Sequence, residues 1–300
     1  QVEDWGESVQ IEHDVAAIIN KQERYGFKFD ENKGRVLLAQ LSSEVADIEG
    51  ELQVTFPPIV QRRISEVTGK ALKDKVTPFN PGSRQQIAWR LATLGVKFTR
   101  ETEKGSIVVN EKVLEGIELP EAKLIARYLM LQKRISQVSS WFEAVQADGR
   151  VRGRVITNGA VTGRMTHMSP NMAQVPSSSS EYGPECRELW TVDKGKRLVG
   201  TDASGIELRM LAHYMQDVRY IKTVCEGKQE EGTDVHTMNM KAAGLTSRNQ
   251  AKTFIYAFLY GAGPGKIGAI IGGSSTDGHH LMTRFLRNTP ALEHLRDEVV

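Results

Sequence analysis

The sequence predicts an α+β protein that is mostly helical, with short strands near its middle. Apolar residues recur at helical spacing along residues 11–52 and again in the C-terminal third. Residues 151–161 are instead β-branched and rich in glycine, as in short strands. The chain has 300 residues, 40% hydrophobic and 25% charged, a composition typical of soluble proteins with two or three domains.

Bulk properties exclude several classes of protein. A net charge of +2 does not by itself predict a nucleic-acid partner, so such a partner has to be argued from local basic clusters. Two cysteines supply neither a disulfide framework nor a zinc site, and they suit a reducing cytoplasm. No apolar run approaches the ~20 residues of a membrane helix. The chain starts with Gln1 and stops at Val300 without a helix-ending signal, so we expect a fragment.

The first elements are expected to be two helices within residues 11–52, joined by an extended turn at residues 25–30. The first has apolar residues at Ile11, Val15, Ile18 and Ile19. The second has a longer apolar stripe between residues 36 and 52. Both are amphipathic, and we expect them to pack on each other.

Residues 54–83 form a basic segment interrupted by prolines, and we interpret it as a connector. Its cations are Arg62, Arg63, Lys70, Lys73 and Lys75. Such a segment is either solvated or ordered by contact with nucleic acid or protein, and the sequence leaves both open. Helical spacing resumes after Ser83, and a further helix is expected to end at the basic residues 132–134.

A candidate cation site follows the strands. Residues 197–201 read as a strand that ends at Asp202, and Gly205 then allows a turn into a helix over residues 206–215. A carboxylate fixed at a strand end, beside an exposed backbone carbonyl, offers the oxygen ligands of a hard cation. The alternative is that Asp202 only caps the helix.

A second candidate site lies on a helix that Ser247 and Gln250 are expected to start as a capping box. Gly261 and Gly263 are expected to end it. Four residues are spaced four apart, so each lies only about 40° around the helix from the last. They are Arg248, Lys252, Tyr256 and Tyr260. Two cations followed by two rings suit a nucleotide, although an amphipathic helix with solvated charges is the alternative.

The opposite face of this helix is expected to enter the core through Ala251, Phe254, Ile255 and Phe258. Two other patterns carry no site. The glycines at 263, 265 and 268 follow a helix rather than a strand, so they are not a dinucleotide fingerprint. His279 and His280 lack companion ligands and are expected in a surface loop.

Taken in order, these segments resemble the family A DNA polymerases, of which DNA polymerase I is a member, and in particular the replicative enzymes of short-tailed bacteriophages. Residues 162–164 with 170–176 resemble the primer-contacting motif, residues 202–209 resemble motif A, and residues 248–261 resemble motif B. Residues 79–83 and 234–237 match the phage branch.

The resemblance implies a truncated right-hand polymerase fold, in which a helical thumb and fingers flank an incomplete antiparallel palm sheet. Residues 1–150 would be the thumb with a short basic insertion at about 55–77, 151–215 the first part of the palm, and 216–300 the fingers.

The resemblance also implies roles in binding metal and nucleotide. Asp202 resembles the first metal-binding aspartate of a site for two Mg²⁺ ions, with the carbonyl of Ala203 as a second ligand. Arg248, Lys252 and His236 match the contacts to the triphosphate of a deoxynucleotide.

Further roles concern the sugar and the DNA. Glu207 resembles the steric gate against ribose, and Tyr256 the ring beside the sugar that hydrogen-bonds that gate. Tyr260 resembles the ring at the templating position, and Arg164 and Gln174 resemble contacts to the primer.

The implied function is template-directed DNA synthesis by nucleotidyl transfer onto a primer during phage replication, in the cytoplasm of the bacterial host. The 300 residues lack the second catalytic carboxylate and the proofreading exonuclease of the family. We therefore expect this chain alone to be inactive. The alternative is a non-catalytic half that binds primer-template and nucleotide and is completed in trans.

Two related functions are not expected. The insertion at about 55–77 is short, so we do not expect a thioredoxin-type processivity factor to bind there. A single-subunit RNA polymerase is disfavoured because Glu207 should block ribose.

Overall fold

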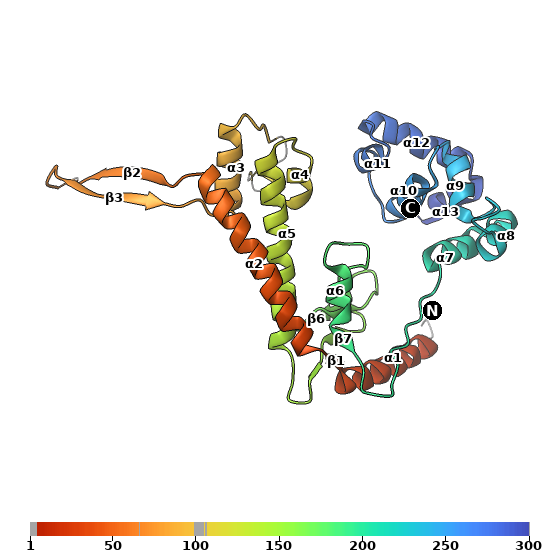
Figure 1. The fold of residues 1–300 in the computed structure, drawn as a ribbon. Coiled ribbons are helices and arrows are strands. Elements are labelled where there is room, and N and C mark those ends of the chain that lie inside the picture. The colour runs from red at the N-terminus through yellow and green to blue at the C-terminus, as the bar shows by residue number, and fades with distance from the viewer. Residues whose placement is uncertain (1–4, 66, 99–104, 106, 300) are drawn as a thin grey trace. The chain divides into compact units, whose positions relative to one another are not determined.

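The computed structural model describes residues 5–65, 67–98, 105 and 107–299. The chain forms two compact units, Gln1–Leu198 and Val199–Val300. Both are drawn in Figure 1. The expected boundaries after residues 150 and 215 fall inside these units.

The core of the first unit lies between two long helices that are far apart in the sequence (Figure 1). α1 (Gly6–Tyr25) and α2 (Glu31–Thr55) flank strand β1 (Phe27–Phe29), as expected. The expected packing of α1 on α2 is wrong, because α2 packs along α5 (Pro120–Glu143) and α1 has no buried residue. Periodicity shows that a helix has an apolar face, but not which helix will cover it.

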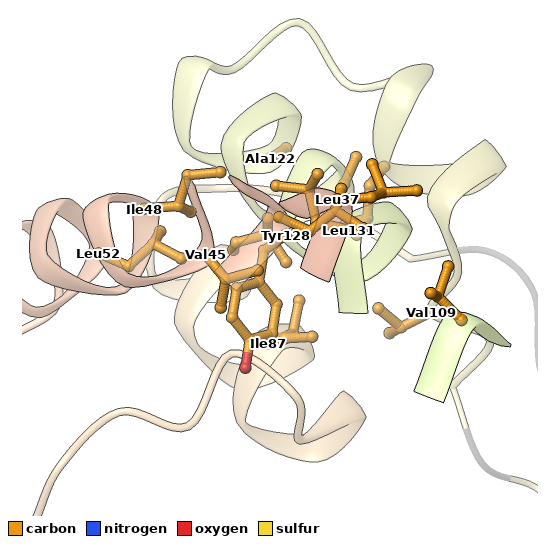
Figure 2. Close-up of a cluster of buried hydrophobic side chains, with 14 of the residues drawn as sticks. Leu37, Val45, Ile48, Leu52, Ile87, Val109, Ala122, Tyr128 and Leu131 are labelled. Atoms are coloured by element: carbon orange, nitrogen blue, oxygen red, sulfur yellow. The ribbon is translucent and has the colours of Figure 1, made fainter. Parts of the chain in front are cut away.

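The α2–α5 interface is a close-packed layer of mainly aliphatic side chains that also includes Tyr128 (Figure 2). Leu41, Leu52 and Leu131 are fully buried in it, and Ile87 of α3 (Arg84–Thr93) joins them. The short helix α4 (Glu111–Glu115) also contacts α5. α5 runs past the basic residues 132–134 to Glu143, so the expected end there is wrong. Val138 and Trp141, both buried, continue its apolar face and extend the helix.

Residues 55–77 are not an irregular connector. They contain an antiparallel hairpin of β2 (Ile59–Ile64) and β3 (Ala71–Thr77). The sequence did not reveal the strands because the hairpin buries no side chain on either face. It therefore lacks the alternation of apolar and polar residues by which a half-buried strand is detected.

The expected short strands are present and antiparallel. β1 lies between β4 (Arg150–Val151) and β7 (Trp190–Thr191), and β5 (Arg154–Ile156) pairs with β6 (Thr166–Met168). A 3₁₀ turn η1 (Met172–Gln174) and helix α6 (Gly183–Glu188) complete this part of the unit.

The strand expected at residues 197–201 is absent, and this prediction is wrong. The segment is irregular, with Leu198 63% and Val199 81% exposed. A β-strand is stable only when its backbone groups pair with a neighbour. No segment in the described part of the chain pairs with this one.

The second unit is helical. Its elements are α7 (Ile206–Met215), α8 (Val218–Glu226), α9 (Val235–Ala243), α10 (Arg248–Leu259), α11 (Pro264–Ile270), α12 (Ser275–Arg287) and α13 (Pro290–Val299). The predicted helix over 206–215 is confirmed with these bounds. His279 and His280 are exposed but lie in α12, so the expected loop is wrong; a capping box of Ser274 and Asp277 starts that helix. No helix among the described residues is long and apolar enough to cross a membrane.

Candidate functional site

Helix α10 turns the predicted apolar face toward the core of the second unit. Ser247 is its N-cap, and the Ser247 side chain accepts a hydrogen bond from the backbone amide of Gln250. The expected core face is confirmed. Ala251, Phe254 and Ile255 are buried, and half-buried Phe258 packs on the same core. Because this face is fixed in the core, the stripe that begins at Arg248 lies toward the other side of the helix.

The stripe begins with an ion pair between Arg248 and Asp234. Arg248 donates from Nη2 to Oδ1 of Asp234 at 2.8 Å, and from Nε to Oδ1 at 3.1 Å and Oδ2 at 3.3 Å. Only 10% of the Asp234 side chain and 28% of the Arg248 side chain are exposed. This fork holds the guanidinium in one orientation and at the helix N-terminus.

The Asp234 carboxylate accepts hydrogen bonds from other groups besides Arg248. It caps α9, where its carboxylate accepts from the backbone amide of His236 at 3.0 Å and from the hydroxyl of Thr237 at 2.6 Å. Burial alone would raise the pKa of Asp234, but the hydrogen bonds from Arg248 and Thr237 and the charge of Arg248 bring it well below its usual range. The carboxylate is therefore ionised at neutral pH.

Sequence reasoning gave Asp234 no role, although it is the residue that holds Arg248. The available signal was an aspartate directly before a helix, which predicts an N-cap. Nothing in the sequence indicated that the same carboxylate would also bind a cation 14 positions further on. That contact depends on how α9 packs against α10.

His236 lies among the cations of this site. Its pKa is lowered by burial and by the charges of Arg248 and Lys252, while the charge of Asp234 acts in the opposite direction. Its ring centroid lies 6.1 Å from that of Tyr256. Its Nδ1 atom is buried and has no hydrogen-bond partner among the described residues. The imidazole is therefore neutral at pH 7 and has an unused polar atom.

The hydrogen bond to Glu207 comes from Tyr260 and not, as expected, from Tyr256. Tyr260, at the end of α10, donates to Oε1 of Glu207 at 3.1 Å. Burial and then the charge of Glu207 raise the pKa of Tyr256, so this ring also lies within the field of the carboxylate. Tyr256 lies in the last turn of α10 and Tyr260 is its C-cap, and it is the Tyr260 hydroxyl that reaches Glu207.

Asp202 and Ala203 lie on the exposed, irregular segment before α7. The N-cap of α7 is Gly205, in the left-handed conformation (φ 59°), so the alternative that Asp202 caps the helix is wrong. No group of three or more His, Cys, Asp or Glu side chains gathers as a metal site in the described part of the chain. The metal-binding roles expected for Asp202 and Ala203 stay predictions.

The expected primer contacts belong to the first unit. Arg164 is exposed, and its carbonyl accepts from the amide of Ala160 at 3.0 Å. Gln174 lies in η1, and its carbonyl accepts from the side chain of Gln137 on α5 at 2.5 Å. Gln174 also lines an open groove of about 580 Å³ with Lys133 and Arg134 of α5. The basic part of α5 and the expected primer motif thus share one groove.

Comparison with known proteins decides the family. The sequence profile described as "DNA polymerase family A" matches residues 56–300. The chain belongs to DNA polymerase family A. Within this family, the chain is 37% identical to the DNA-directed DNA polymerases of Enterobacteria phage T3 and Escherichia phage T7. Each comparison covers 98% of this chain and 52% of the relative, so the chain spans about half the length of these curated relatives.

More distant family A members share the same region. The thermostable DNA polymerase I of Thermus aquaticus is 26% identical over 84% of this chain and 29% of its own length. A solved structure titled "POL domain of Pol1 from M. smegmatis complex with DNA primer-template and dNTP" superposes with a TM-score of 0.74 at 19% identity. It covers 93% of this chain and 47% of that one, and it confirms the truncated right-hand fold expected from the sequence.

Proposed function

We propose that this chain carries the nucleotide-binding part and much of the DNA-binding part of an enzyme for template-directed DNA synthesis in phage replication. The observation that carries the proposal is a cluster on α7, α9 and α10 of the second unit, here called the nucleotide cluster. Its members are Glu207, His236, Arg248, Lys252, Tyr256 and Tyr260.

Within the nucleotide cluster, charge and rings are arranged as an incoming nucleotide requires. Arg248 and exposed Lys252 lie in the first turns of α10, where the helix dipole also favours an anion. They suit the triphosphate and would stabilise the charge that develops on the leaving pyrophosphate. Asp234 would act as a positioning residue, because it fixes the Arg248 guanidinium before any nucleotide arrives.

The rest of the nucleotide cluster suits selection of the sugar. Glu207 is half-buried and tethered by Tyr260, so its carboxylate cannot swing freely away from α10. A bulky side chain held beneath the sugar would exclude a ribose hydroxyl sterically. Tyr256 is close to His236 and within the field of this carboxylate, and it would stack beside the sugar.

Two Mg²⁺ ions are the cofactor that the family implies, and the residues of this chain fit part of that site. The Asp202 carboxylate and the Ala203 carbonyl are hard oxygen donors on an exposed segment. Mg²⁺ in such enzymes is held by one or two carboxylates together with substrate phosphates and water. When bound, the ions activate the primer hydroxyl and offset the charge of the triphosphate.

We further propose that these 300 residues bind substrates but do not extend a primer alone, because they contain a match to only one of the two catalytic carboxylates. The second carboxylate would come either from the same polypeptide or from a separate one in trans. Arg164, Gln174 and the groove that Gln174 lines would position the primer without reading its sequence.

The test uses the chain as it is, with a fluorescent primer-template and Mg²⁺. We expect the chain to bind the DNA and the matching deoxynucleotide to slow its dissociation, without any primer extension. Absence of DNA binding would refute the proposed function, and extension by the chain alone would refute its inactivity.

The same assay tests the sugar gate. For Glu207→Ala, we expect the matching ribonucleotide to slow dissociation about as well as the deoxynucleotide, whereas for the unsubstituted chain only the deoxynucleotide does. Tyr260→Phe removes the observed tether and should relax the selection partly, with Tyr256→Phe as the matched control for loss of a hydroxyl. Unchanged sugar selection in Glu207→Ala would remove Glu207 from the gate.

A further inference from the structure

Helix α9 carries two buried polar atoms that have no hydrogen-bond partner among the described residues. They are Nδ1 of His236 and Oδ1 of Asn239, and the described part of the chain has only one other such side-chain atom, Nε1 of Trp190. Most buried polar atoms in native proteins are paired, because an unpaired one costs free energy. Two such atoms about one helical turn apart therefore call for an explanation.

Asn239 is fully buried and is held from one side. Its Nδ2 donates to the hydroxyl of Tyr220 on α8 at 3.2 Å, and Tyr220 is itself only 1% exposed. This bond commits Nδ2 to α8 and leaves Oδ1 as the free end of the amide. A polar side chain at such a position is unfavourable unless a donor also bonds its oxygen.

His236 is placed to supply that donor. Residues three apart in a helix lie on one face with their Cβ atoms about 5–6 Å apart, and side chains lean toward the helix N-terminus. The Asn239 side chain therefore leans over the turn of α9 that contains His236. Two other donors in this region, Thr237 and Arg248, already bond Asp234.

We infer that Asn239 is a positioning residue for His236: the imidazole donates from Nδ1–H to Oδ1 of Asn239 after a small side-chain rotation, which directs Nε2 to the triphosphate. This inference rests on the proposed function. The bond pairs both buried atoms at once. It also selects the tautomer, because the bond made by one ring nitrogen decides which nitrogen carries the proton.

The selected tautomer couples binding of the triphosphate to a proton. A neutral imidazole has one N–H, so the bond to Asn239 leaves a lone pair on Nε2, and a phosphate oxygen cannot accept a hydrogen bond there. On nucleotide binding, Nε2 takes a proton from solvent, the ring becomes an imidazolium, and Nε2–H donates to the phosphate. Asn239 accepts Nδ1–H before and after this step.

The surrounding charges make this proton uptake depend on the nucleotide. Arg248 and Lys252 oppose an imidazolium at His236 and Asp234 favours it, so the negative triphosphate supplies the missing stabilisation. The ionisable groups that α9 and the elements packed against it contribute here are Asp234 on α9, Tyr220 on α8, Arg248, Lys252 and Tyr256 on α10, and Arg284 of α12 beside Gly244 at the end of α9.

The first test is nitrogen-15 NMR of the histidine-labelled chain without nucleotide, in which bare and protonated ring nitrogens have different shifts. His236→Gln identifies the signals of His236 among the seven histidines. We expect a proton on Nδ1 in the unsubstituted chain and loss of this preference in Asn239→Leu. Tyr220→Phe is the matched control, because it also removes a buried hydrogen bond but keeps the Asn239 oxygen, so Nδ1–H should persist.

The second test measures how much matching deoxynucleoside triphosphate is needed to slow dissociation of the fluorescent primer-template, from pH 6 to pH 9 with Mg²⁺. Relative to His236→Gln, in which the nucleotide titrates equally, the unsubstituted chain should lose affinity as the pH rises, because the bound proton is lost. Asn239→Leu should bind about tenfold more weakly at pH 6, and the difference should shrink toward pH 9. In the His236→Gln background, Asn239→Leu should have no further effect.

Three results would overturn the inference. The first is a bare Nδ1 in the unsubstituted chain, a readout that decides even if Asn239→Leu does not fold. The second is an equal loss of affinity from Asn239→Leu with and without His236, because Asn239 would then act on the fold alone. The third is an affinity that follows the same pH profile as His236→Gln. If Nδ1–H is found but the deoxynucleotide has no effect on the unsubstituted chain, it is the proposed function that fails.

Discussion

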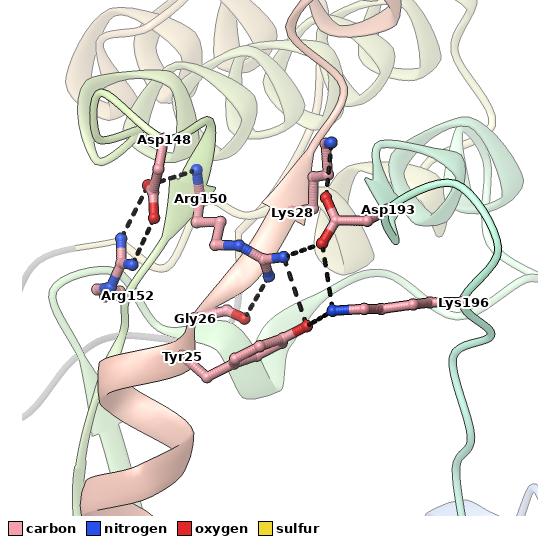
Figure 3. Close-up of polar contacts among 8 residues, drawn as sticks. All are labelled: Tyr25, Gly26, Lys28, Asp148, Arg150, Arg152, Asp193 and Lys196. Carbon is pink, nitrogen blue, oxygen red and sulfur yellow. Dashed lines mark hydrogen bonds and ion pairs between the residues drawn. The ribbon is translucent and has the colours of Figure 1, made fainter.

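Two aspartates, one in each unit, collect cations in contrasting ways. Asp193 of the first unit lies between Lys28 (2.8 Å), Arg150 (2.5 Å) and Lys196 (3.7 Å), and Arg150 also stacks on Tyr25 (Figure 3). Asp234 of the second unit has one cation, Arg248, but also bonds from Thr237 and a backbone amide.

The two sites differ chiefly in burial. The side chain of Asp193 is 37% exposed and that of Asp234 10%. An exposed ion pair contributes little because water screens it, whereas breaking a desolvated pair leaves a buried charge without a partner. The number of cations around a carboxylate is therefore a poor guide to its contribution. The hairpin β2–β3 is a third case, since its cations Arg62, Arg63, Lys70, Lys73 and Lys75 are exposed and have no ion-pair partner among the described residues.

The largest effect on the free energy of unfolding is expected from substitution of Asp234. Asp234→Asn should lower the free energy of unfolding by about 2–3 kcal/mol, because Arg248 loses its counter-charge and Thr237 and the α9 amide lose a charged acceptor. Urea unfolding measures it. Asp297→Asn, which removes an exposed carboxylate beside Arg296, is the matched control and should change little. Equal effects in the two variants would show that burial does not set the difference.

An intermediate effect on the free energy of unfolding is expected when the pH is lowered. The pKa of Asp234 is lowered in the folded chain, so its contribution to stability is complete above the unfolded value of about 4 and is lost as the pH falls through the folded pKa. Unfolding free energies measured from pH 6 down to pH 2 should therefore fall more steeply for the unsubstituted chain than for Asp234→Asn. Parallel curves would mean that this carboxylate is not the one that titrates.

The smallest effect is expected at Asp193. Its pKa is lowered by the hydrogen bond from Lys28 and by the charges of Arg150 and Lys196, but more than a third of the side chain is exposed to solvent. Asp193→Asn should destabilise the chain less than Asp234→Asn, and the loss should disappear in 1 M salt, where the Debye length is about 3 Å. A loss that persists in high salt would indicate a structural role for this cluster.

The sequence by itself determined the features that depend on near neighbours along the chain. The apolar spacing predicted α7 with its observed bounds, and Ser247 predicted the start of α10. The face of α10 that enters the core followed from the same 3.6-residue period. These properties could be predicted because helix periodicity and capping act within about one turn.

Only the tertiary structure decided which distant groups meet. It paired α2 with α5 rather than α1, joined Arg248 to Asp234, and gave the hydrogen bond of Glu207 to Tyr260. It also left residues 197–201 unpaired and made a hairpin of a segment that reads as a connector. Each outcome depends on contacts between elements far apart in the sequence, and local periodicity contains no information about those partners.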